Sequence, residues 1–155
     1  MDDRSSSVAG GYRVCGAGRT LALVVGVACL SPATAASPAA PDAYATRLGA
    51  LVNDYRSVQG IAPLEADERL GALAREHSVE MANAGTMSHD GFKARFARSG
   101  YAMCVENVGW NYATPEAQFA GWKASPGHDR NLRDTRVEHM GIGIAANYVT
   151  FLACR

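Results

Sequence analysis

The chain has 155 residues, and its 15 Lys plus Arg balance its 15 Asp plus Glu, so the formal net charge at pH 7 is zero. This balance excludes the basic stripe of a nucleic-acid-binding protein and the polybasic patch of a membrane-surface protein. With hydrophobic residues at 48%, the length fits one domain with a modest core.

Residues 1–35 are typical of a secretory signal peptide. A polar segment that contains three arginines precedes an uninterrupted apolar run, residues 21–28. The tripeptide at 33–35 has the small-x-small pattern that signal peptidase recognises. We expect cleavage directly after this tripeptide, with Ala36 and Ala40 as alternative sites.

Two alternatives to a cleaved leader have weaker support. The apolar run is too short for a membrane anchor, since a spanning helix needs about 20 apolar residues. Lipidation of Cys29 would require a large aliphatic residue three positions earlier, where the chain has Gly26. The sequence therefore predicts an exported protein, periplasmic or extracellular, with no transmembrane segment once the leader is removed. Cleavage lowers Lys plus Arg from 15 to 12 and Asp plus Glu from 15 to 13, a net charge near −1.

Cysteine usage agrees with export. Cys15 and Cys29 leave with the leader, and Cys104 and Cys154 remain. An even pair in an exported chain predicts a disulfide. The bond would close a loop of about 50 residues and contribute roughly 4 kcal/mol on the loop-entropy model. Two buried thiols are the alternative.

Residues 36–42 are a short Pro/Ala linker, and the domain is predicted to span residues 43–155. Apolar periodicity, caps and glycine stops predict helices at 43–59, 67–83, 92–99, 114–125 and 128–134. Strands are predicted at 103–108, 140–144 and 148–153, the last two joined by a turn at Ala146-Asn147. Helices first and an antiparallel hairpin last are an α+β pattern, in which helices pack on a small sheet.

Three details of these elements concern packing. Asp42 is expected to cap the first helix. The helix at 92–99 is expected to turn Phe92 and Phe96 inward. Residues 61–64 are expected to be an extended connector.

Three polar residues stand in contexts that suit neither a core nor a plain surface. His89 lies in a loop between two glycines, Glu106 lies in a mostly apolar strand, and His128 follows Ser-Pro-Gly at a helix start. Two imidazoles and a carboxylate are a set for a divalent metal, and equally for acid–base chemistry. Their spacing is not that of a metalloprotease helix, so only a fold that brings them together makes a site.

Each of these residues also has a structural interpretation. Glu106 can accept hydrogen bonds from neighbouring backbone amides, because a buried carboxylate needs such partners or a cation. His89 and His128 can form hydrogen bonds to Glu106 between them without any ligand. At the level of sequence these interpretations stay open.

Other residues are assigned structural positions. His77 is predicted to be a satisfied core histidine, His139 an exposed histidine, and Trp122 a core anchor. Ser88 and Ser125 each stand near a histidine, but neither has the nucleophile-elbow sequence of a serine hydrolase.

Four blocks of sequence, taken in order, resemble one family. They are residues 51–56; residues 63–64 with Leu70, Ala74, His77-Ser78, Met81 and Ser88-His89; Glu106-Asn107-Val108-Gly109 followed by Trp122; and Ser125-Pro126-Gly127-His128 with Asn131-Leu132, then Gly141-Ile142-Gly143. Over residues 45–153 the chain resembles the bacterial, SCP-like branch of the CAP superfamily of cysteine-rich secretory proteins, antigen 5 and pathogenesis-related protein 1. A single block is a weak signal, and the four in this order are specific.

The resemblance implies an α-β-α sandwich, with a small antiparallel sheet between helical layers and an open central cleft. Family members gather two His and two acidic residues there, and His89, Glu106 and His128 match three of these positions. The second acid has no clear counterpart; Asp90 is the only acid between the first His and the Glu-Asn block. Divalent ions, including zinc, have been seen at the family's His pair, which makes His89 and His128 the expected metal ligands. No shared catalytic reaction is established for the family, and some members bind sterols or other lipids in separate grooves.

These observations support three functions, in this order. The first is an exported binding or interaction module, whose His/Glu cleft takes a divalent cation such as zinc, a small ligand or a peptide. The second is a metal-assisted hydrolase of peptides or cell-envelope polymer, with Glu106 as the candidate catalytic base. The third is a lipid or sterol carrier. The expected partner is thus a small ligand, a peptide or an envelope component, and not a nucleic acid.

Overall fold

The computed structural model describes residues 41–155; the predicted leader and residues 36–40 of the predicted linker lie outside the described residues. In chain order the elements of this range are α1 (Pro41–Val58), β1 (Glu65–Ala66), α2 (Glu68–Ala84), α3 (Phe92–Ser99), β2 (Cys104–Trp110), α4 (Pro115–Ala124), α5 (Pro126–Leu132), β3 (His139–Ala145) and β4 (Tyr148–Cys154). Within residues 41–155, no helix is both long enough and apolar enough to cross a membrane.

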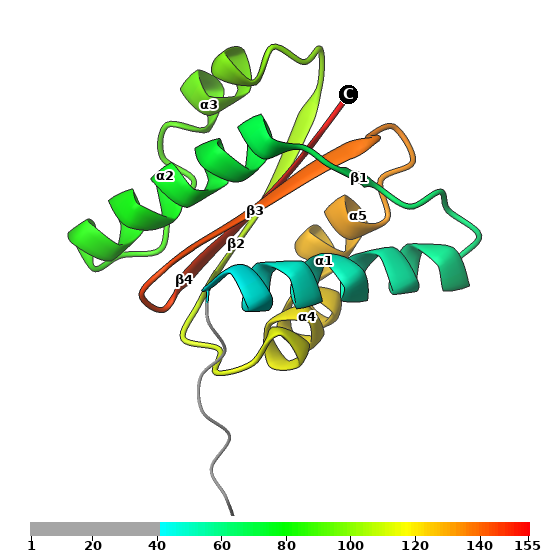
Figure 1. The fold of residues 1–155 in the computed structure, drawn as a ribbon, viewed down its shortest axis with the longest axis horizontal. Coiled ribbons are helices and arrows are strands. Elements are labelled where there is room, and N and C mark those ends of the chain that lie inside the picture. The colour runs from blue at the N-terminus through cyan, green and yellow to red at the C-terminus, as the bar shows by residue number, and fades with distance from the viewer. Residues whose placement is uncertain (1–40) are drawn as a thin grey trace, which may run out of the picture. The chain divides into compact units, whose positions relative to one another are not determined.

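Helices flank the sheet on both faces (Figure 1). The strand order in the sheet is β1-β3-β4-β2. Helix α2 packs on β3 and β4 with α3 beside it, whereas α1, α4 and α5 pack on the other face. The α+β class and the layered sandwich expected from the sequence are therefore confirmed.

The sheet is mixed rather than purely antiparallel. Strands β2 and β3 both pair antiparallel with β4, but Glu65 and Ala66 of β1 pair in parallel with His139 and Met140 of β3. The sequence predicts only an extended connector before this point, because a strand of two residues has no periodicity of its own.

Two helices begin earlier than the sequence predicts. Helix α1 begins at Pro41, so Asp42 lies in its first turn instead of capping it, and residues 41–42 of the predicted linker are helical. Helix α5 begins at Pro126, because the fixed φ of proline suits the first position of a helix.

The inward face of α3 also differs from the prediction. Arg95 and Ser99 are its buried residues, whereas Phe92 and Phe96 are half-buried. The two phenylalanine rings stack against each other, with centroids 6.5 Å apart. The reason for the difference is a polar contact of Arg95, which is described below.

Alternation along β4 divides its side chains between two cores. Every residue of this strand is buried. Val149 and Phe151 join the larger core, which α1, α4 and α5 cover. Leu152 and Cys154 join the core under α2. The strand therefore connects both helical layers.

Helix α2 lies so close to β3 that the backbones of the two elements pack directly against each other. Gly141 and Gly143 face α2, and a Cβ atom at either position would collide with the α2 backbone. Ser78 of α2 donates a hydrogen bond to the Gly143 carbonyl at 2.9 Å, and its hydroxyl lies 2.9 Å from that of Thr150. These contacts set the position of α2, and with it the loop that follows α2.

The predicted disulfide is present between Cys104 and Cys154. The two residues are cross-strand partners at the start of β2 and the end of β4. Their sequence separation is 50 residues. The bond therefore ties the outer strand β2 to the centre of the sheet.

Replacing Gly143 with Ala should destabilise the fold by about 1–3 kcal/mol, the usual cost of overpacking, because the added methyl group meets the backbone of Arg75 in α2. Gly71→Ala is the matched control on the facing helix. Its Cβ has no neighbour within 4 Å, and removing a helical glycine gains about 0.5–1 kcal/mol. Urea unfolding measures both variants, and equal stability of the two would contradict close packing of α2 on β3.

Candidate functional site

The three residues that the sequence singles out come from three elements around the outer strand β2. Glu106 lies within β2, His89 lies in the loop between α2 and α3, and His128 lies in the first turn of α5. Strand β2 ends the strand order and pairs with β4 on its inner side. His89 comes from the layer of α2 and α3, and His128 comes from the opposite layer. We call these three residues the histidine site.

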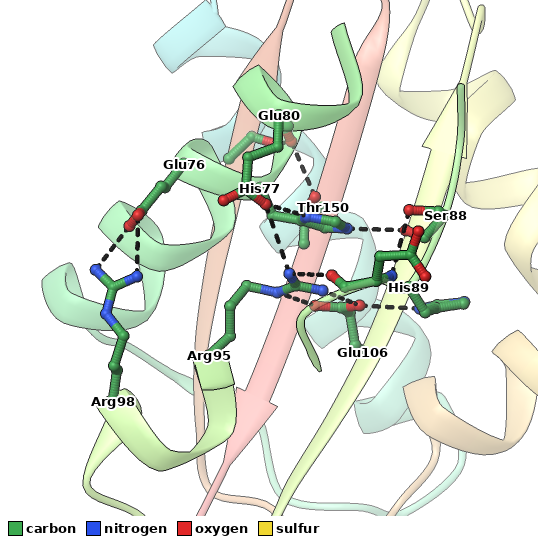
Figure 2. Close-up of polar contacts among 12 residues, drawn as sticks. Glu76, His77, Glu80, Ser88, His89, Arg95, Arg98, Glu106 and Thr150 are labelled. Atoms are coloured by element: carbon green, nitrogen blue, oxygen red, sulfur yellow. Dashed lines mark hydrogen bonds and ion pairs between the residues drawn. The ribbon is translucent and has the colours of Figure 1, made fainter. Parts of the chain in front are cut away.

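A buried ion pair holds Glu106. Arg95 of α3 donates from Nε to Oε2 at 2.8 Å and from Nη2 to Oε1 at 2.9 Å, as Figure 2 shows. The side chains of Arg95 and Glu106 are 5% and 2% exposed. The sequence interpretation offers backbone amides as partners of Glu106; a bidentate guanidinium takes that role instead.

His89 completes the surroundings of Glu106. Its Nδ1 lies 2.9 Å from Oε1, and because a carboxylate only accepts hydrogen bonds, this nitrogen carries the proton. Burial raises the pKa of Glu106, but the hydrogen bonds from His89 and Arg95 outweigh burial and hold that pKa below its ordinary value of 4.5. At neutral pH Glu106 is therefore an anion with both oxygens occupied.

The outer edge of His89 is open. Its side chain is 52% exposed, and within residues 41–155 no hydrogen bond is made to its Nε2. With the proton on Nδ1, neutral His89 presents the Nε2 lone pair outward. Because the Glu106 carboxylate accepts the hydrogen bond from Nδ1, it fixes both the orientation and the tautomer of the His89 imidazole.

Two hydrogen bonds anchor the loop on either side of His89. His77 of α2, which is 1% exposed, places its Nε2 2.8 Å from the Ser88 carbonyl. Arg95 donates from Nη1 to the Asp90 carbonyl at 2.6 Å. His77 is thus the satisfied buried histidine that the sequence predicts, and it positions His89 through the backbone.

Glu80 of α2 joins these two anchors (Figure 2). Its Oε2 lies 2.9 Å from His77 Nδ1 and 3.7 Å from Arg95 Nη1. The Glu80 carboxylate and the Ser88 carbonyl are both hydrogen-bond acceptors, so His77 has an acceptor within reach of each ring nitrogen. Helix α2, the loop and α3 therefore share one polar network with Glu106.

His128 is positioned through its backbone. Asn107 donates to the His128 carbonyl at 3.1 Å. Asn131 in turn donates to the Asn107 side chain at 2.8 Å and to the Glu106 carbonyl at 3.1 Å. The half-buried His128 imidazole has its pKa lowered, first by burial and then by the charge of His89. The charge of His89 therefore acts on the His128 imidazole.

Within residues 41–155 the histidine site does not present the three or four protein ligands of a zinc centre. Asp90, the substitute considered for the family's second acid, is exposed, and its hydrogen bonds involve its backbone. Among residues 41–155, no group of three or more His, Cys, Asp or Glu side chains is arranged to hold a metal ion. Zinc sites use three or four protein ligands, and Arg95 occupies Glu106. His89 and His128 are thus two imidazoles without a third protein ligand in this range.

The remaining sequence assignments concern structural residues. Trp122 is the core anchor that was predicted: it is 1% exposed, and its indole N–H donates to a backbone carbonyl of β2 at 2.8 Å. His139, predicted to be exposed, is half-buried, with its ring 5.3 Å from that of Tyr101. Within residues 41–155 neither Ser88 nor Ser125 donates its hydroxyl to an imidazole.

Arg95 is the residue that sequence reasoning missed. It lies three residues after Phe92 and four before Ser99, so it shares their helix face. A carboxylate in an apolar strand needs a cation or several donors, and this requirement is the signal that could have led from Glu106 to Arg95. The sequence alone does not say which of the nearby cations satisfies it.

Comparison with known proteins agrees with this fold. The family model for CAP, the cysteine-rich secretory protein family, matches residues 50–154. The uncharacterized protein YkwD of Bacillus subtilis is 30% identical over 117 residues, which cover 71% of this chain and 46% of that protein.

Two solved structures have a similar fold. An extracellular protein containing an SCP domain from Bacillus anthracis aligns with a TM-score of 0.71 at 24% identity, over 74% of this chain and 41% of that chain. A cysteine-rich secretory protein from Staphylococcus aureus aligns with a TM-score of 0.68 at 18% identity, over 74% and 38%. The chain thus spans less than half the length of each of these three relatives.

Arg95→Met should destabilise the protein by about 3–5 kcal/mol, because it leaves Glu106 buried without its cation. Arg98→Met on the same helix is the control. The ion pair of Arg98 with Glu76 has side chains 56% and 47% exposed, and exposed pairs contribute about 0–1 kcal/mol. Urea unfolding at neutral pH compares the variants. Equal losses would show that burial does not distinguish the two pairs.

The pKa of His128 should lie below its ordinary value of 6.5, and this makes acid destabilising. As the pH falls through 6.5, His128 becomes protonated in the unfolded chain but stays neutral in the folded protein. The contribution of His128 to the free energy of unfolding is therefore full above pH 6.5 and decreases as the pH falls toward the folded pKa. Glu106, with its lowered pKa, adds a second loss in the same direction below 4.5.

An NMR titration of the imidazole signals measures this pKa directly. In His89→Gln the pKa of His128 should rise, because the repulsion from protonated His89 is lost while burial persists. His139→Gln is the control and should leave it unchanged. A pKa of His128 that does not respond to His89→Gln would refute the coupling of the two imidazoles.

Proposed function

The chain belongs to the CAP family of cysteine-rich secretory proteins, and we propose that it is an exported binding module for a small polar ligand or a peptide. The ligand contacts the Nε2 edge of His89 and the imidazole of His128. The observation that carries this proposal is the buried pair of Arg95 and Glu106.

That pair favours binding over hydrolysis. A general base needs an accessible oxygen and a pKa near neutrality. Oε1 of Glu106 accepts from His89 and Arg95, Oε2 accepts from Arg95, and the pKa of the carboxyl is lowered. Glu106 therefore supports His89 rather than activating a water molecule.

The two imidazoles determine the chemistry of the ligand. In its neutral form His89 accepts a hydrogen bond at Nε2, and the lowered pKa of His128 favours the neutral form of that imidazole. Such a pair suits hydroxyl and amide groups, which glycans and peptide backbones offer. A divalent ion would find two protein ligands and would need water for the rest, which makes it the weaker occupant.

Export is part of the proposal. The leader pattern of residues 1–35 supports it, although that segment lies outside the described residues. The Cys104–Cys154 disulfide supports it independently, because such bonds persist in oxidising compartments. The mature domain accordingly works in the periplasm or outside the cell.

A lipid ligand has one observation in its favour. An open pocket of about 490 Å³ is lined by residues of α1, α2 and β3, among them Met140 and Ile142. It shares no residue with the histidine site, so a lipid bound there would not depend on His89 or His128.

NMR titration of the isotope-labelled domain tests the polar-ligand proposal. N-acetylglucosamine and a capped alanine peptide are added in turn at millimolar concentration. At least one should shift the backbone amides of residues 88–90 and the His128 signals, and should saturate. The affinity should fall about tenfold in His89→Gln/His128→Gln, since each hydrogen bond contributes about 0.5–1.5 kcal/mol. His139→Gln should bind like the wild type.

Three results would contradict the proposal. The first is the absence of specific binding, seen either as no saturable shift with both probes or as equal affinity of the wild type and the double variant. The second is stoichiometric zinc binding that requires both His89 and His128, which would replace the polar ligand by a metal ion. The third is cleavage of a probe that is lost in Glu106→Gln, which would replace binding by hydrolysis.

A further inference from the structure

Arg56, in the last turn of α1, is buried, and among residues 41–155 one of its terminal nitrogens has no hydrogen-bond partner. The residue is 1% exposed. Its Nε donates to the Ala62 carbonyl at 2.8 Å, and its Nη1 donates to the carbonyls of Leu132 and Asp134, both at 2.9 Å. A guanidinium has five N–H donors, and the two on Nη2 have no hydrogen-bond partner among residues 41–155.

Arg56 also lacks a counter-ion within residues 41–155. The other buried arginine among residues 41–155, Arg95, forms an ion pair with Glu106. In the part of the chain that the structure describes, Arg56 forms none. The acid that acts on it electrostatically is Asp134, whose carboxylate is bound to Arg136. Among residues 41–155 the fully buried side-chain atoms without a hydrogen-bond partner belong to Gln118, so Nη2 of Arg56 is open to solvent and can meet an anionic group supplied from outside.

A cavity of about 480 Å³ lies against Arg56, a volume that suits a small ligand. Its other walls are the loop after α1, residues 60–63, with Glu65, and the segment between residues 135 and 139. In Figure 1 these two stretches run near each other at the right of the sheet, where the green chain after α1 passes the orange chain before β3. None of the lining residues belongs to the histidine site.

We propose that this cavity binds the carboxylate of an amino acid or a short peptide. The carboxylate accepts both N–H groups of Nη2 and supplies the counter-charge of Arg56. Two carboxylates at the cavity, Glu65 and Glu138, are 82% and 59% exposed. Glu65 lies 3.8 Å from Nδ1 of His139, and Glu138 lies 3.2 Å from Nε of Arg155. Because these contacts are exposed, the carboxylates can also face the ammonium group of the same ligand. They would repel phosphate or sulfate. Ile61 and Val137 give the ligand apolar contacts.

Arg56 has a structural role as well, because its hydrogen bonds hold two loops together. A variant of Arg56 that fails to fold would therefore carry no information about a ligand. The test keeps Arg56 and changes the ligand instead. Alanyl-alanine has both charged ends, its C-terminal amide lacks the carboxylate, and its N-acetyl derivative lacks the ammonium group.

The isotope-labelled domain is titrated with each peptide, and the amide signals of residues 60–65 and 135–139 are followed. Alanyl-alanine should shift these signals and saturate in the millimolar range. The C-terminal amide should bind about tenfold more weakly or worse, because the charged hydrogen bonds to Arg56 are lost. The N-acetyl derivative, and Glu65→Gln with the free dipeptide, should each bind roughly two- to fivefold more weakly. Glu68→Gln, outside the cavity, should match the wild type.

Two results would overturn the proposal. One is the absence of a saturable shift at these residues with alanyl-alanine. The other is equal affinity for the free dipeptide and its C-terminal amide, which would mean that the carboxylate does not meet Arg56. Because the readout excludes residues of the histidine site, failure here leaves the function proposed for that site untouched.

Discussion

The buried ion pair between Arg95 and Glu106 is the contact on which the histidine site depends. It joins α3 to the outer strand β2, and it makes a charged residue acceptable inside a mostly apolar strand. Removing both charges from water is costly, and the bidentate geometry offsets much of that cost. The same contact orients the site, because His89 takes its tautomer from Glu106 and its loop is held at the Asp90 carbonyl by Arg95.

The other supports of the site begin in the sheet. Helix α2 can lie directly on β3 because Gly141 and Gly143 have no side chains. This position brings His77 to the loop that carries His89. On the opposite layer, Asn107 holds the backbone of α5. The backbone packing of the sheet thus determines where both imidazoles lie, and no single interaction between them is needed.

The ion pair with Arg95 changes the chemistry that is open to a set of two histidines and one glutamate. Without Arg95, Glu106 would be available to take a proton or bind a metal. With Arg95 in place, Glu106 is an orienting anion, and the groups left for a ligand are the imidazoles. The requirement for a partner charge also separates Arg56 from Arg95. Both guanidiniums are buried, but within residues 41–155 only Arg95 has a carboxylate in contact.

The sequence by itself determined the helices, the hairpin, the disulfide pair and the polar residues considered for a site. These features are encoded locally, by apolar periodicity, by residue chemistry and by caps such as Thr114 before α4 and Gly85 after α2. Only the tertiary structure decided that Arg95 meets Glu106, that β1 joins β3 in parallel, and that Arg56 is buried without a counter-ion among residues 41–155. Each of these depends on contact between residues far apart in the chain. A cation on a short amphipathic helix has the same local pattern whether water or a buried carboxylate satisfies it.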